Sequence, residues 1–293
     1  MKHLIEHLPE ILLHTLLDTL KLIPFLFLAY LLMEYLEHRS GNAAERQLRR
    51  SGRIGPLIGA ALGILPQCGF SVAATGLYTG RVITTGTLIA VFLSTSDEML
   101  PVLLSEGAPF PTVAQILGVK LAVGIAAGFL IDTVERIIHR KRSIVTEPQI
   151  EALCEREKCR CGEHFALSAL RHTAHITLFI LLFTFLIELV IHGVGEEKLG
   201  ALLNGTPVLS HVVAALVGLI PNCASSVALT EMYLGGILSA GAMLAGLLVN
   251  AGIGLAVLFR NNRPVRDSFR ILAILLGIGI SVGILLDGIG FLA

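Results

Sequence analysis

Long apolar segments that are almost free of charge dominate this chain of 293 residues. Each segment exceeds the roughly 18 apolar residues that mark a candidate membrane-spanning helix. Only 15% of the residues are charged, against roughly a quarter in soluble domains. We therefore expect an all-α polytopic membrane protein. The apolar segments are 17–36, 55–79, 84–104, 112–132, 172–192, 208–233, 237–259 and 271–291.

Lysine and arginine are concentrated in three of the connections between these segments. The basic connections are 37–54, 133–171 and 260–270, whereas 105–111 and 193–207 hold one lysine between them. Because basic loops stay in the cytoplasm, we place the first three inside and the other two outside. We expect a protein of the bacterial inner (cytoplasmic) membrane with both termini outside.

This assignment conflicts with the number of apolar segments. Between the inner connection 37–54 and the outer connection 105–111 the chain must cross the membrane an odd number of times. Two apolar segments, 55–79 and 84–104, lie between these connections. Segments 208–233 and 237–259 raise the same conflict. In each pair the first segment contains a Pro-x-Cys break that divides it into halves of about 10–12 residues, too short to span a bilayer. Proline tends to end a helix, so we predict that 55–79 and 208–233 are re-entrant hairpins.

The two Pro-x-Cys breaks belong to an internal repeat. With an offset of 155 residues, 63–93 and 218–248 are identical at twelve of 31 positions. Three crossings in each repeat would turn the second upside down, the arrangement of many secondary transporters. We predict two inverted repeats, each with three transmembrane helices and one broken re-entrant hairpin, ten helical pieces in all. The alternative is an ordinary bundle with two broken spans.

The prediction divides the chain into three regions. The first membrane repeat covers 1–132, with its hairpin at about 55–79. A charged cytoplasmic loop that contains Cys and His follows at 133–171. The second, inverted repeat covers 172–293, with its hairpin at about 208–233.

Polar side chains recur in pairs around the two breaks. A broken helix frees backbone carbonyls toward a cavity, and paired amide, thiol and hydroxyl groups suit a transition metal or a soft metalloid. The stretch "FLSTSDEML" adds two carboxylates within a span, where ionisable groups usually mark an ion pathway. The alternatives are core packing of the small residues and an outer-interface position of the carboxylates. The candidate substrate-binding or metal-binding residues are Gln67, Cys68, Ser71, Thr75, Asp97, Glu98, Asn222, Cys223, Ser226, Thr230 and Asn250.

Ionisable residues near the membrane edges are candidates for proton coupling or gating. These are Asp18, Glu34, His172, His175, Glu188 and Glu231. His172 and His175 share a helix face, and histidine titrates near neutral pH. The alternative is that these side chains snorkel to the interface. Lys120 lies inside an apolar span and must be deprotonated or paired, but the sequence does not identify a partner.

Three of the five cysteines lie in the polar loop "CEREKCRCGEH". Cys154, Cys159, Cys161 and His164 could capture a metal there, although their spacing is not that of a common zinc site. The alternative is a solvated, charged loop. Cysteines so distributed do not form the framework of a secreted disulfide-rich protein.

The chain resembles a known family at both Pro-x-Cys repeats, "ILPQCGFSVAATGLYTGR" and "LIPNCASSVALTEMYLGG". The resemblance extends to "DTLKLIPFLFLAYLLMEYLEH" (18–38) and "RHTAHITLFILLFTFLIEL" (171–189) and so spans nearly the whole chain. The family is that of ten-helix heavy-metal exporters, also described as manganese transporters or arsenic efflux proteins. The resemblance implies export of a metal or an arsenical. The predicted six spans and two hairpins, with two half-helices in each hairpin, also give ten helical pieces, the number in the family description.

Our leading hypothesis is a proton-coupled secondary transporter that exports a divalent transition metal, manganese above others. One alternative is an exporter of arsenite or another thiophilic species. An alternative of a different class is an intramembrane thiol redox protein that uses Cys68 and Cys223. A further alternative is a channel or a non-transporting membrane scaffold. We expect no enzymatic activity and no cofactor besides the transported metal ion.

The expected partners are the lipid bilayer and the metal-ion substrate. The formal net charge is zero, so we expect no binding to nucleic acid. The sequence shows no nucleotide-binding motif and gives no sign of an ATPase subunit. A homo-oligomer is compatible with the sequence.

Overall fold

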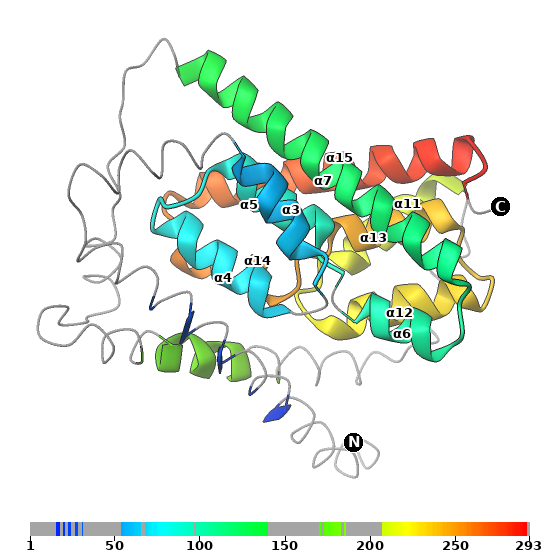
Figure 1. Ribbon diagram of the computed structural model, residues 1–293, viewed down its shortest axis with the longest axis horizontal. Helices are drawn as coiled ribbons and strands as arrows, with labels where there is room; N and C mark the ends of the chain where they lie inside the picture. The colour runs from blue at the N-terminus through cyan, green and yellow to red at the C-terminus, as the bar shows by residue number, and fades with distance from the viewer. Residues whose placement is uncertain are drawn as a thin grey trace, which may run out of the picture.

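The computed structural model describes residues 54–65, 68–96, 98–139, 173–182 and 207–291, and ten further single positions (16, 17, 20, 23, 24, 27, 28, 31, 170 and 185). All regular structure within these residues is helical (Figure 1). Four stretches are long and apolar enough to cross a membrane: Thr85–Ser105, Phe110–Ile138, Ala240–Asn261 and Val265–Gly288. The prediction of an all-α polytopic membrane protein is confirmed.

The helices of the first half recur in the second half in the same order. The first half contains α3 (Gly55–Gly63), α4 (Cys68–Thr79), α5 (Thr85–Ser94), α6 (Met99–Ser105) and α7 (Phe110–His139). The second half contains α11 (Pro207–Gly218), α12 (Cys223–Leu234), α13 (Ala240–Val249), α14 (Ile253–Asn261) and α15 (Val265–Gly288). The helices α5 and α13 pack against α3 and α7 and against α11 and α15, respectively. The orientation of the two halves relative to a bilayer stays a prediction.

Glycines allow the same close helix contact in both halves. Gly86 on α5 lies against the backbone of Gly128 on α7, and a side chain at Gly86 would collide with that carbonyl. Gly241 on α13 lies against Gly283 on α15 in the same way. Both pairs are related by the sequence offset of 155 residues. The repeat is therefore a repeat of packing as well as of sequence.

The Pro-x-Cys segments each form two short helices. The first gives α3 and α4, and the second gives α11 and α12. None of these helices exceeds 12 residues, or about 18 Å, whereas the hydrocarbon core of a bilayer is roughly 30 Å thick. These lengths agree with the prediction that the two segments are broken.

Two spans that we expected to be continuous, 84–104 and 237–259, are also divided. In the first, α5 ends at Ser94 and α6 begins at Met99; in the second, α13 ends at Val249 and α14 begins at Ile253. The Thr95 hydroxyl donates to the carbonyl of Val91 at 2.7 Å and so competes with backbone N–H groups for this helical acceptor. At the second break Gly252 adopts a positive φ of 54°, which glycine tolerates. We call the interruption between α5 and α6 the first span break, and the interruption between α13 and α14, residues 250–252, the second span break.

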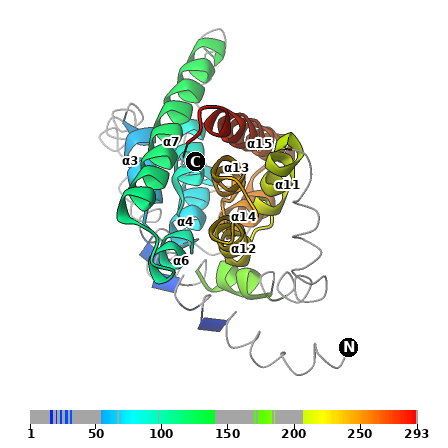
Figure 2. The same cartoon turned by 90° about the vertical axis from the view of Figure 1, so that its right-hand side faces the viewer.

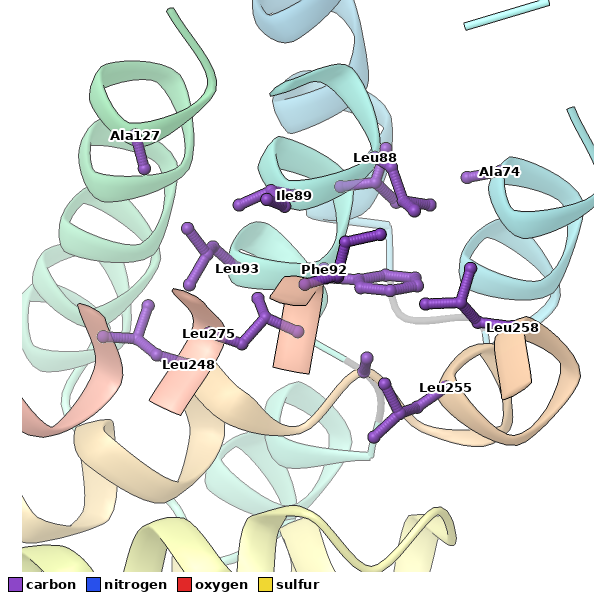
Figure 3. Close-up of a cluster of buried hydrophobic side chains, with 13 residues drawn as sticks. Ala74, Leu88, Ile89, Phe92, Leu93, Ala127, Leu248, Leu255, Leu258 and Leu275 are labelled. Atoms are coloured by element: carbon purple, nitrogen blue, oxygen red, sulfur yellow. The ribbon is translucent and has the colours of Figure 1, made fainter. Parts of the chain in front are cut away.

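The two halves share a hydrophobic core. One buried cluster combines side chains from α4, α5 and α7 with side chains from α13, α14 and α15. Figure 3 shows Phe92 of α5 close to Leu275 of α15, with Leu255 and Leu258 of α14 beside them. This shared core holds the halves together as one body.

Corresponding helices also make corresponding contacts between the two halves. Helix α4 packs against α14, and α12 packs against α6 (Figures 1 and 2). By the repeat, α4 corresponds to α12 and α14 corresponds to α6, so these two contacts are equivalent. The second arm of each hairpin therefore packs against the broken span of the other half.

Candidate functional site

The first hairpin contacts the start of α14, just after the second span break. The hydroxyl of Thr75 on α4 donates to the carbonyl of Gly254 on α14 at 3.1 Å. The backbone of Ser71 lies so close to Gly254 that a β-carbon there would approach it to 2.8 Å. Ser71 and Thr75 are both fully buried. The first half of α4 is thus fixed against the start of α14.

The same hairpin also contacts the first span break. The Ser96 hydroxyl donates to the carbonyl of Ile64, which lies two residues before the proline of the first Pro-x-Cys break. Gly63 lies against the side chain of Ser94. The end of α3 therefore contacts residues at the end of α5, whereas α4 contacts the start of α14.

The second hairpin has the matching arrangement. Gly218 at the end of α11 packs on the carbonyl of Gly246, just before the second span break, while α12 packs against α6. Ser226 and Thr230 are buried like their counterparts Ser71 and Thr75. Thr230 donates to the Ser226 carbonyl at 2.7 Å, as Thr75 does to the Ser71 carbonyl at 2.9 Å. Both hairpins bring hydroxyl groups into the centre of the molecule.

Two buried asparagines of the candidate site have side-chain N–H groups that donate no hydrogen bond to any described residue. Asn222 is 4% exposed and Asn250 is 2% exposed, and among the described residues neither Nδ2 has a hydrogen-bond partner. The Oδ1 of Asn250 accepts from the backbone N–H of Gly252 at 2.9 Å, which fixes the direction of its amide. A buried donor without a partner costs about 1–3 kcal/mol, so a water molecule or a ligand atom is expected there.

The remaining described candidates occupy other positions on the helices. Cys68 and Cys223 are the first residues of α4 and α12. Glu98 directly precedes α6, is partly buried and makes no capping hydrogen bond. His175 and Glu231 are exposed. Among the described residues, no three His, Cys, Asp or Glu side chains come together as a preformed metal site.

Ten predicted residues lie outside the described part of the chain, and their roles stay predictions. They are Asp18, Glu34, Gln67, Asp97, Cys154, Cys159, Cys161, His164, His172 and Glu188.

The structure reveals carboxylate contacts that our sequence reasoning missed. Asp132 on α7 accepts from the N–H of Gly86 at 2.9 Å and caps the start of α5. Asp287 on α15 accepts from the N–H of Gly241 at 2.7 Å and caps the start of α13. It also lies 3.0 Å from the Nε2 of the buried His211. The offset of 155 residues between Asp132 and Asp287 was a usable signal, but both lie outside the compared segments.

Polar groups from both halves surround a cavity of about 320 Å³ beside α4, α5 and α7. Tyr78 lines it and donates to Asp267 on α15 at 2.5 Å. Glu135 also lines it and pairs with Arg270 on α15 at 3.3 Å. The helices here lead into the basic connections 133–171 and 260–270, so by our assignment the cavity lies at the cytoplasmic edge.

The fold and these contacts define a polytopic helical membrane protein with paired broken helices at its centre. A family model described as "Putative, 10TM heavy-metal exporter" matches residues 8–151 and 137–259. The chain belongs to this family, and the resemblance seen in the sequence is confirmed. The match supports a transporter rather than an enzyme. No curated protein and no solved structure matches the chain.

Proposed function

We propose that this protein is a secondary transporter that exports a divalent transition metal, manganese above others, in exchange for protons. The observation that carries the proposal is the reciprocal packing of each broken hairpin on the broken span of the other half. This packing gathers four interrupted helices in the interior of an apolar protein. Discontinuous helices that meet inside a membrane are typical of transporter binding sites.

The available donor atoms suit a hard cation. At both span breaks the chain leaves the helix and frees backbone carbonyls. Buried hydroxyls of Ser71 and Ser226 lie on α4 and α12, which pack against α14 and α6. Glu98 adds a carboxylate that α6 does not use as a cap. Oxygen ligands of this kind are preferred by Mn²⁺ over soft thiophilic metals.

The repeat suggests how transport would proceed. The two hairpins and the two span breaks occupy corresponding positions in the repeat, and corresponding helices pack against each other. If the repeats are inverted, exchanging the packing of the two halves would expose the central site first to one side and then to the other. Protons would then return through ionisable groups such as Asp97 and Glu98.

A thiophilic cargo such as arsenite is the second candidate, and one observation favours it. Cys68 and Cys223 are the first residues of α4 and α12. A helix N-terminus stabilises negative charge, including that of a thiolate. Both sulfur atoms would then serve as ligands for a soft metalloid.

Two substitutions separate these candidates in a metal-sensitivity assay of cells that depend on this exporter. We expect Cys68→Ser to keep protection against Mn²⁺ and Asp97→Asn to lose it. The opposite pattern, with protection against arsenite lost in Cys68→Ser and Mn²⁺ tolerance unchanged in Asp97→Asn, contradicts a manganese site and supports the thiophilic cargo.

A further inference from the structure

Polar contacts join the two repeats at the edge that we assign to the cytoplasm. The Tyr78 hydroxyl of α4 donates to Asp267 of α15 at 2.5 Å, and the same carboxylate oxygen accepts from the amide of the buried Asn262 at 3.1 Å. Arg270 of α15 pairs with Glu135 of α7 at 3.3 Å. Two helices of the first repeat are therefore held against one helix of the second, beside the cavity that Tyr78, Glu135 and Asn262 line.

The opposite edge is closed in a different way. The offset of 155 residues gives each of the five residues a counterpart, and among the described residues no side-chain hydrogen bond or ion pair joins these counterparts. Tyr233, the counterpart of Tyr78, instead packs on an apolar cluster that contains Met99 and Leu103 of the first repeat and Met243 of the second. The counterparts of Tyr78, Asp267, Arg270, Glu135 and Asn262 are Tyr233, Thr112, Gln115, Gly290 and Gly107.

The two edges also differ in what it costs to separate the repeats. Separating an apolar cluster exposes apolar surface, and the free-energy cost rises with the area exposed. Separating a hydrogen bond or an accessible ion pair costs little, because water replaces the lost partners. Arg270 is 47% exposed, so its pair with Glu135 is already accessible. The polar contacts can therefore break and re-form with a small change in free energy.

From this difference we propose that the Tyr78–Asp267 and Glu135–Arg270 contacts form a gate on the cytoplasmic side, which we call the cytoplasmic gate. The inference rests on the proposed function and on the cytoplasmic placement of 133–171 and 260–270. While both contacts are formed, α4 and α7 are held against α15 and the edge is closed. When they break, the helices separate and a cation enters from the cytoplasm. The four residues control access and are not ligands of the bound cation.

A reversible tether tests whether the Glu135–Arg270 contact must open during transport. In the double variant Glu135→Cys/Arg270→Cys, a bis-methanethiosulfonate reagent joins the two positions. We expect Mn²⁺ flux into liposomes that contain the tethered full-length protein to fall at least about tenfold, and dithiothreitol should restore it. The two single variants, which keep the native cysteines, are the matched controls and should keep their flux after the same treatment. Unchanged flux in the tethered protein overturns the inference, because the contact is then static.

Reversal of charge tests the gate without a tether. Arg270→Glu places two carboxylates opposite each other, so a membrane-impermeant thiol reagent added on the cytoplasmic side should modify Cys68, at the start of α4, about tenfold faster than in the wild type. Glu135→Arg combined with Arg270→Glu restores the pair in reverse and should return the rate to within about threefold of the wild type. Peptide mass spectrometry distinguishes Cys68 from the other cysteines.

The two experiments separate failure of the gate from failure of the proposed function. Equal rates of Cys68 modification in Arg270→Glu and the wild type overturn the gate, as does a double variant that reacts as fast as folded Arg270→Glu. If the untethered cysteine variant is inactive, the rates of Cys68 modification decide. A wild-type protein without Mn²⁺ flux refutes the proposed function, whereas wild-type flux that persists in the tethered protein refutes the gate alone.

Discussion

Thr75 in the first repeat donates a hydrogen bond to the carbonyl of Gly254 in the second repeat, with 3.1 Å between the oxygen atoms. The residues are 179 positions apart in the chain, yet the contact fixes a hairpin arm beside the opposite span break. Two features of α14 allow this approach: Gly254 has no side chain, and the helix begins immediately after the flexible backbone of Gly252. The candidate site depends on contacts of this kind.

The first prediction concerns Gly254. A methyl group in Gly254→Ala would come within 2.8–2.9 Å of the Ser71 backbone and side chain, so α4 and α14 must move apart. Overpacking of this kind costs about 1–3 kcal/mol. We expect a lower thermal unfolding midpoint in detergent and a loss of metal transport.

Gly277→Ala is the matched control for Gly254→Ala. No neighbouring atom lies within 4 Å of the position that a β-carbon would take at Gly277. Because alanine favours a helix over glycine by about 0.5–1 kcal/mol, this variant should be unchanged or slightly more stable. Equal losses in both variants contradict the close contact between α4 and α14.

The second prediction concerns the two aspartate caps. Asp132→Ala and Asp287→Ala each remove the acceptor that the start of α5 or α13 uses, which should cost about 1–2 kcal/mol. Asp287→Ala should be the more destabilising variant, because it also leaves the buried His211 without its carboxylate. Thermal unfolding of both purified variants checks which one is less stable. A smaller loss of stability in Asp287→Ala than in Asp132→Ala rules out a stabilising role for the pair of His211 and Asp287.

The third prediction concerns the contact between Tyr78 and Asp267. Tyr78→Phe removes a hydrogen bond of 2.5 Å that joins the first repeat to α15. We expect a loss of about 1 kcal/mol in the free energy of unfolding. Tyr233→Phe, at the equivalent position of the second repeat, is the matched control and should have a smaller effect. If the control variant loses as much stability, the Tyr78–Asp267 contact does not join the repeats.

The fourth prediction separates the two ends of the Asn250 amide. Asn250→Asp keeps the oxygen that accepts from the N–H of Gly252, whereas Asn250→Ala removes it. The alanine variant should therefore lose about 1 kcal/mol of stability, and the aspartate variant should lose less when it is measured at a pH low enough to keep its buried carboxyl neutral. Thermal unfolding tests this difference. Equal unfolding midpoints for the two variants contradict the turn at the second span break.

The sequence predicted the helical class, the repeated order of the helices and the two segments that are broken at Pro-x-Cys, because proline and cysteine recur in register in apolar surroundings. It did not predict the breaks in 84–104 and 237–259. Thr95 and Asn250 act there through local backbone hydrogen bonds, which leave hydropathy unchanged. The hydrogen bond from Lys120 to the carbonyl of Leu247 could not be predicted either, because Leu247 lies 127 residues away in the chain and contributes only a backbone atom.

The most direct test of the central claim measures Mn²⁺ flux in liposomes that contain the purified full-length protein. An imposed pH gradient should drive Mn²⁺ across the membrane, and the rate should fall to the protein-free level when the gradient is collapsed. Asp97→Asn should abolish the flux in the same preparation. Flux that is independent of the pH gradient contradicts proton coupling, and the absence of Mn²⁺ flux in folded, reconstituted protein contradicts the proposed manganese exporter.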